Sequence, residues 1–160
     1  MLLTTLLGTA LIVTPLDSSD FVLFESDKYS FEVPRGWSVG KETPWGARDI
    51  TTKSDSGKFG AMTAGPTQAS WDELYQTSLY FIKREGKGKE TPYRLGKSKQ
   101  GYATMSFEVV NPEGFADRRY VLLKAESGLA LALSVKIPGK SQEKEYAQMF
   151  RHMVDTAKFK

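Results

Sequence analysis

The sequence predicts an α+β domain in which an antiparallel β-sheet meander is flanked by two amphipathic helices. Three observations carry this prediction. The strand segments come in consecutive hairpins, two other segments repeat apolar residues with the period of a helix, and the order along the chain is strands, helix, strands, helix. With 160 residues, of which 40% are apolar and 26% charged, the chain has the size and composition of one globular domain.

The first two strands are predicted at residues 21–24 and 29–33, where apolar residues run together or alternate with polar ones. A Ser-Asp pair between them suits the turn of a hairpin. The Pro-Arg-Gly-Trp segment at residues 34–37 ends the second strand, because proline supplies no amide donor and glycine permits a sharp reversal. Its Trp37 is assigned to the core, since aromatic side chains bury a large area.

A second hairpin is predicted at residues 47–53 and 58–64, on either side of a Ser-Asp-Ser-Gly turn. A helix follows, opened by Ser70 and Glu73 at the spacing of a capping box. Its predicted apolar face consists of Trp71, Leu74, Tyr75, Ser78 and Ile82. Two glycines and several charges end this helix within residues 84–89.

The longest strand candidates are residues 102–110, 117–125 and 129–137, which short glycine-containing turns separate. In the third candidate, large aliphatic residues share one face, and the smaller residues of the other face suit a covering helix. Ser141 is predicted to cap a final helix. The apolar side of that helix consists of Tyr146, Met149, Phe150, Met153 and Ala157.

The first 19 residues have the pattern of an export signal. Residues 1–13 form an apolar run too short to span a bilayer, and a polar Asp-Ser-Ser-Asp segment follows at 17–20. No lysine or arginine precedes the run, so a buried first element or a start inside a longer leader are the alternatives. We expect a leader at residues 1–19 and a single domain at residues 20–160.

The segment Tyr29-Ser30-Phe31-Glu32-Val33-Pro34-Arg35-Gly36-Trp37 is similar to the aromatic-x-Phe-x-x-Pro-x-x-Trp opening of the PsbP-like superfamily. Residues 128–136 resemble the penultimate strand of that family, and residues 156–159 resemble its closing segment. The superfamily includes photosystem II extrinsic subunits, DcrB-like envelope proteins and a Ran-binding nuclear factor. The resemblance covers residues 20–160 and implies a PsbP-like α/β/α sandwich with a binding or accessory role and no enzymatic activity.

The amino-acid composition excludes several kinds of catalytic and metal site. The chain has no cysteine, which excludes disulfides, thiolate metal sites and thiol nucleophiles, and it has one histidine. We therefore predict no catalytic residues, no cofactor and no metal site. A net charge of +3 is too small to indicate a nucleic-acid partner, and a monomer is expected.

A basic run follows the first predicted helix and is the strongest candidate for partner binding. It contains seven basic and two acidic residues. The basic residues are Lys83, Arg84, Lys87, Lys89, Arg94, Lys97 and Lys99. The run is either a docking patch for an acidic partner or a solvated glycine-rich loop.

Three further residues are candidate partner contacts. Arg118 and Arg119 are adjacent in a strand, so they point to opposite faces and one of them is expected to be exposed. They either grip a carboxylate or phosphate, or serve as edge-strand protection or a local ion pair. Trp45, between proline and glycine, is either an exposed anchor for a partner or a cover over the end of the sheet.

His152 is predicted on the exposed face of the final helix, next to Arg151. Asp155 follows three residues later, at a spacing where side chains meet, so the two form either a weak metal pair or an ordinary surface pair.

These observations predict an exported, non-catalytic accessory protein that docks on a membrane-associated or envelope protein complex, of which photosystem II is one type. Export places it in the periplasm, outside the cell or in the thylakoid lumen. The alternatives are a cytoplasmic chaperone or adaptor that binds a hydrophobic partner segment, and an enzyme, which requires convergent polar groups in a groove.

Overall fold

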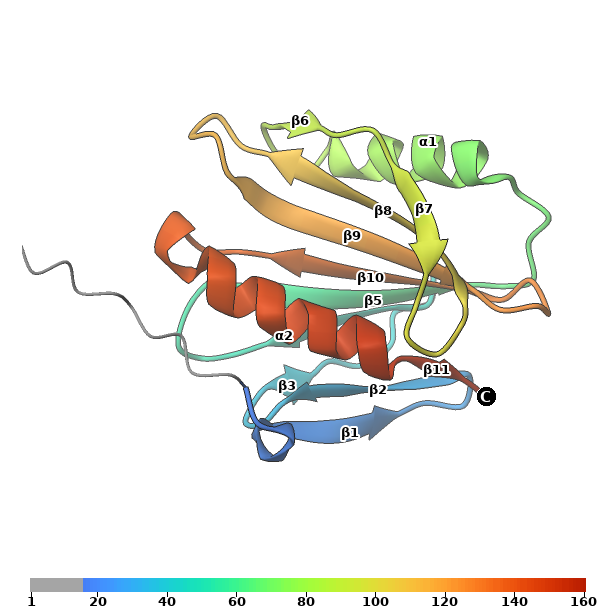
Figure 1. Ribbon diagram of the computed structural model, residues 1–160, viewed down its shortest axis with the longest axis horizontal. Helices are drawn as coiled ribbons and strands as arrows, with labels where there is room; N and C mark the ends of the chain where they lie inside the picture. The colour runs from blue at the N-terminus through green and yellow to red at the C-terminus, as the bar shows by residue number, and fades with distance from the viewer. Residues whose placement is uncertain (1–15) are drawn as a thin grey trace, which may run out of the picture.

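The computed structural model describes residues 16–160 (Figure 1). A large β-sheet forms the middle layer, with helix α1, Trp71–Ile82, on one face and helix α2, Glu143–Thr156, on the other. A small sheet packs beside α2. The predicted α+β class, with antiparallel strands and two amphipathic helices, is confirmed. The apolar run predicted to be the core of a leader, residues 1–13, lies outside the described residues.

The large sheet has eight strands, and neighbouring strands are antiparallel. Along one path their order is β3-β4-β5-β10-β9-β8-β6, and β7 also pairs with β8. The bounds are β3 Ser38–Val39, β4 Ala47–Thr51, β5 Lys58–Ala64, β6 Lys89–Glu90, β7 Arg94–Lys97, β8 Ala103–Val110, β9 Ala116–Lys124 and β10 Ala130–Lys136. The predicted β4-β5 hairpin and the predicted β8-β9-β10 meander are confirmed.

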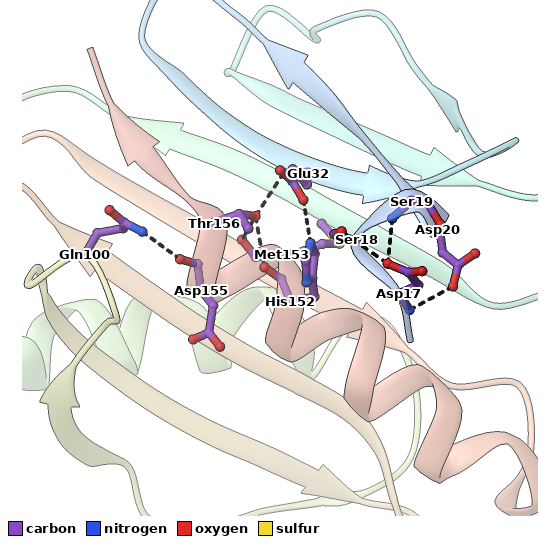
Figure 2. Close-up of polar contacts among 10 residues, drawn as sticks. All are labelled: Asp17, Ser18, Ser19, Asp20, Glu32, Gln100, His152, Met153, Asp155 and Thr156. Atoms are coloured by element: carbon purple, nitrogen blue, oxygen red, sulfur yellow. Dashed lines mark hydrogen bonds and ion pairs between the residues drawn. The ribbon is translucent and has the colours of Figure 1, made fainter. Parts of the chain in front are cut away.

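The small sheet joins the two ends of the domain. It consists of β1, Phe21–Glu25, β2, Tyr29–Pro34, and β11, Lys158–Phe159, in the order β1-β2-β11. β1 and β2 form the predicted hairpin, whereas β11 brings the residues after α2 back to the start of β2. A short 3-10 turn at Ser18–Asp20 leads into β1 and is capped by the Asp17 carboxylate (Figure 2).

Helix α1 begins at the predicted capping box. The Glu73 amide donates to Ser70 Oγ at 3.2 Å, and the Ser70 amide donates to Glu73 Oε2 at 2.7 Å, so two of the amides that lack partners at a helix start are satisfied. The inner side of α1 packs through Leu79 and Ile82 on a cluster that contains Phe107 of β8. Trp71, Leu74 and Tyr75, all predicted on this face, are partly buried against the same cluster.

Helix α2 has the predicted apolar face but a different start. A 3-10 turn, Lys140–Gln142, precedes it, and Gln142 occupies the N-cap position without a side-chain bond. The predicted Ser141 cap is therefore wrong, because this residue lies within the 3-10 turn. The predicted apolar residues of α2 are all buried and pack between the two sheets; they are Tyr146, Met149, Phe150, Met153 and Ala157.

Strand β10 shows how the middle layer serves both helices. Leu131, Leu133 and Val135 are buried in the cluster that contains α2, and Ala132 packs on the opposite side, in the cluster that contains α1. The prediction that a helix covers the small-residue face is confirmed at Ala132. Trp37 is half-buried against the α2 core, with its ring centroid 4.9 Å from that of Phe59.

The basic run at residues 83–99 is not a simple loop. It contains β6 and β7, which pair with opposite ends of β8. Because side chains alternate between the faces of a sheet, this pairing distributes the basic residues over both faces.

Candidate functional site: an arginine-lined cleft

A hollow of about 400 Å³ lies between α2 and the outer strands of the large sheet. Strands β8 and β9 form its floor, α2 forms one wall, and β7 with the residues before it forms the other. We term it the arginine cleft and define it by the lining residues Thr91, Arg94, Ser106, Glu108, Arg119, Val121, Phe150, Arg151 and Val154.

Strand register brings the polar side chains to this hollow. Arg94 in β7 lies opposite Ser106 in β8, and Glu108 in β8 lies opposite Arg119 in β9. Opposed residues of antiparallel strands point to the same face, and residues two apart in one strand share that face as well. Both pairs therefore face α2, which contributes Arg151 from the other side.

The arginine cleft has an excess of positive charge. Arg119 Nη2 donates to Glu143 Oε1 at 2.9 Å, and its Nε lies 3.4 Å from Glu108 Oε1. Arg94 and Arg151 are exposed, and neither forms an ion pair within residues 16–160. Together with Glu143, the lining holds three guanidinium groups and two carboxylates, a balance of 3 − 2 = +1.

This arrangement suits the binding of a carboxylate-bearing segment. Guanidinium groups hold carboxylates with two parallel hydrogen bonds, and Phe150 and Val154 offer apolar contact to the rest of such a ligand. The hydroxyl of Thr91 is engaged with the backbone of Glu108, since it accepts from the amide at 3.0 Å. No histidine lines this hollow to activate a hydroxyl as a nucleophile.

Tyr120 borders the arginine cleft without acting as an acid or a base near neutral pH. Burial raises the pKa of its phenol to about 12, and neighbouring Arg118 offsets this only in part. The group therefore stays protonated.

The two adjacent arginines of β9 have different roles. Arg118 is 6% exposed and lies on the α1 side, where its Nη2 donates to the Lys87 carbonyl at 3.1 Å and its Nε is 3.6 Å from Asp117. Because Arg119 is half-buried, the prediction that one arginine is exposed is wrong. Edge-strand protection is also wrong, because β9 lies between β8 and β10, whereas the local ion pairs are confirmed.

The predicted basic run is not one continuous patch. Arg94 lines the arginine cleft with Arg119, and Lys97 lines a second, more open hollow of about 610 Å³ beside Trp71 and Lys124. The others are exposed in the connection after α1, on β6 or in the turn after β7; they are Lys83, Arg84, Lys87, Lys89 and Lys99. Sequence reasoning did not select Arg151, which completes the cleft from α2.

Trp45 lies far from these cations along the sheet. It is 69% exposed in the connection between β3 and β4, which form the end of the large sheet opposite to β6. The expectation that it covers the end of the sheet is wrong, and the expectation of exposure is confirmed.

The prediction that His152 is exposed is wrong: the residue is half-buried, and its ring meets Glu32 (Figure 2). Its Nε2 is 2.6 Å from Glu32 Oε2 in β2, and its ring stacks on that of Phe21 with centroids 3.8 Å apart. The predicted pair with Asp155 is wrong, because the ring nitrogen of His152 is engaged with Glu32 and no hydrogen bond or ion pair joins His152 to the Asp155 carboxylate in residues 16–160. No group of three potential metal ligands occurs within the described part of the chain.

Comparison with solved structures identifies the kind of fold. No family model matches the sequence, and no curated protein matches it. The solution structure of cyanobacterial PsbP (CyanoP) from Synechocystis sp. PCC 6803 matches 96% of this chain and 99% of its own, with a TM-score of 0.62 and 11% identity. The fold is PsbP-like.

A crystal structure from Bacteroides thetaiotaomicron also matches the PsbP-like chain, with 14% identity over 82% of this chain and 45% of its own. Its TM-score of 0.40 is too low to carry an argument. Neither α1 nor α2 has the length and apolar character that crossing a bilayer requires.

Proposed function

We propose that this chain is a non-catalytic accessory protein that holds an acidic segment of a partner protein in the arginine cleft. The observation that carries the proposal is the convergence of Arg94, Arg119 and Arg151 on one hollow from three different elements. Two of these arginines have no carboxylate of their own among the described residues, so a partner would supply it.

We infer the setting of this partner from the PsbP-like fold. The resemblance at residues 29–37 and the likeness to cyanobacterial PsbP support a partner in a membrane-associated or envelope complex, such as one of the photosystem II type. The apolar run at residues 1–13 supports export of the chain to a compartment outside the cytoplasm. We infer that the protein acts there as a monomer.

Binding of an acidic peptide tests this proposal. A fluorescein-labelled peptide of alternating glutamate and alanine should bind the protein with a salt-dependent affinity, and the peptide with glutamine in place of glutamate should not. Arg94→Gln and Arg151→Gln should each weaken binding about fivefold, because an exposed charge pair contributes roughly 1 kcal/mol.

The matched control is the double variant of Lys41 and Lys53 to glutamine. Both lysines are exposed and neither forms an ion pair in the described part of the chain, so the variant removes the same charge away from the hollow. The variant to compare with it combines Arg94→Gln and Arg151→Gln, and equal affinity of these two double variants would contradict the proposal. Salt-independent binding of both peptides would instead favour the alternative of an adaptor for hydrophobic segments.

A further inference from the structure

The outer side of α1 carries two large aromatic rings near its C-terminal end. Tyr80 is 60% exposed and Phe81 is 52% exposed, and their rings meet edge to face with centroids 5.5 Å apart. Both neighbours in the sequence, Leu79 and Ile82, are buried against the sheet. The two rings therefore point away from the core and contribute little to its packing.

Cations follow these rings directly in the sequence. Residues 83–90 contain four basic and two acidic residues, a balance of 4 − 2 = +2. The guanidinium of Arg84 lies over the Tyr80 ring, 5.1 Å from its centroid, and Lys83 lies 3.7 Å from Glu90. Within residues 16–160, Arg84 and Lys87 form no ion pair.

The segment after α1 is fixed by contacts of Lys87 and Gly88 with strands β8 and β9. Buried Arg118 donates from Nη2 to the carbonyl of Lys87, and a Cβ on Gly88 would lie only 2.6 Å from Val109 Cγ1. The backbone thus passes close over β8 and β9, and only glycine permits this approach. The segment that carries Lys87 is in this way held on the face of the sheet that α1 covers.

We propose that this end of α1 binds an anionic lipid surface. The aromatic–basic surface consists of Tyr80, Phe81, Lys83, Arg84 and Lys87. Aromatic rings favour the level of the lipid head groups, and lysine and arginine next to them attract anionic lipids. None of these residues lines either of the two hollows described above.

The aromatic–basic surface and the arginine cleft lie on opposite faces of the large sheet, since α1 and α2 do (Figure 1). Both can be occupied at once. The lipid inference does not depend on the proposed function, because the two surfaces share no residue.

Sedimentation with lipid vesicles tests the inference on the full chain. The protein should bind vesicles of equal parts phosphatidylglycerol and phosphatidylcholine, and bind pure phosphatidylcholine far more weakly. Tyr80→Ser combined with Phe81→Ser should reduce partitioning about tenfold. Arg84→Gln combined with Lys87→Gln should reduce it about 30-fold, which is roughly fivefold for each cation.

Matched controls separate this surface from the apolar residues 1–13, which every variant retains. Leu95→Ser removes an exposed apolar side chain of β7, and the Lys41 and Lys53 double variant removes two charges elsewhere; both should bind like the parent protein. Circular dichroism confirms that each variant is folded. Equal partitioning of the aromatic variant and the Leu95→Ser control would overturn the inference.

Depth of insertion gives an independent readout. Phe81→Trp keeps an aromatic ring at the surface, and its fluorescence should be quenched by brominated lipids in anionic vesicles more than that of the parent protein. Loss of binding in the charge variant without any added quenching at residue 81 would overturn the inference as well, because it would indicate a purely electrostatic attachment.

Discussion

Replacing Thr156 by valine removes a hydroxyl that joins the end of α2 to the middle of β2 (Figure 2). Thr156 Oγ1 accepts from the Glu32 amide at 3.0 Å and donates to the His152 carbonyl at 2.9 Å. Strand β11 pairs only with Tyr29 and Ser30, so it supplies no acceptor to Glu32. In the variant this amide has no partner on that side of β2.

Valine has nearly the shape of threonine, so the substitution opens no cavity. The expected loss is that of one unsatisfied amide, which costs about 1–3 kcal/mol when fully buried. Because Thr156 and Glu32 are half-buried, water reaches part of this site. We expect the free energy of unfolding to fall by about 1–2 kcal/mol.

Urea unfolding followed by tryptophan fluorescence measures this change, and amide hydrogen exchange at Glu32 reports on the bond itself. Thr156→Ser is the control. It keeps the hydroxyl and loses one methyl group, at a cost of no more than about 0.8 kcal/mol. If the valine variant were as stable as the serine variant, with equal protection of the Glu32 amide, the assigned role of this hydroxyl would be wrong.

Three further substitutions test the fold. Gly57→Ala should lower the free energy of unfolding by about 1–3 kcal/mol, because the added methyl overlaps the ring of Tyr146. Thermal melts measure this loss, and Gly65→Ala, whose added methyl meets no other atom, should be neutral in them. Leu133→Ala, at a fully buried position, should cost about 2–5 kcal/mol in urea unfolding, and a loss below that range would place the core elsewhere. The raised pKa of Tyr120, about 12, stabilises the folded protein fully below pH 10, and this contribution of about 2–3 kcal/mol is lost as the pH rises from 10 to 12. Tyr120→Phe should flatten that alkaline decline, and parallel curves of stability against pH would refute the reasoning.

Elements with a strong local signal were predictable from the sequence. The hairpins β1-β2 and β4-β5 combine apolar strands with turn residues, and α1 combines a capping box with a helical stripe. In these segments the local preference and the final packing agree. The start of α2 was missed because its 3-10 turn depends on the path of the chain out of β10.

The shortest strands were not predictable. β3, β6 and β11 have two residues each, and β7 has four, so none shows an alternating pattern long enough to recognise. Each of them exists because a longer strand offers it an open edge. The same pairing explains why the burial of His152 was not predicted. β11 pairs with β2 and so holds the small sheet next to α2. Phe21 and Glu32 of that sheet then cover His152, although it lies outside the apolar stripe of the helix.

The arginine cleft was predictable only in its parts. Arg94 and Arg119 were selected as separate candidates, but the pairing of β7 with β8 and the alternation along β9 bring them to one face. Arg151 carries no signal of its own, since a cation next to an apolar helix stripe is usually a solvated residue. Arg151 follows Phe150 directly and lies three residues before Val154, and both of these residues line the cleft. Its place in the cleft could therefore be recognised only once the arrangement of the sheet was known.

A titration of the ¹⁵N-labelled protein with the glutamate peptide, followed by NMR, tests the proposed binding site most directly. If the arginine cleft holds an acidic segment, the amide and arginine Nε signals that shift should cluster in β7, residues 106–108 of β8, Arg119 and residues 147–154 of α2. Shifts confined to the exposed lysines beyond α1, or shifts unchanged when Arg94 and Arg151 are both replaced by glutamine, would contradict it.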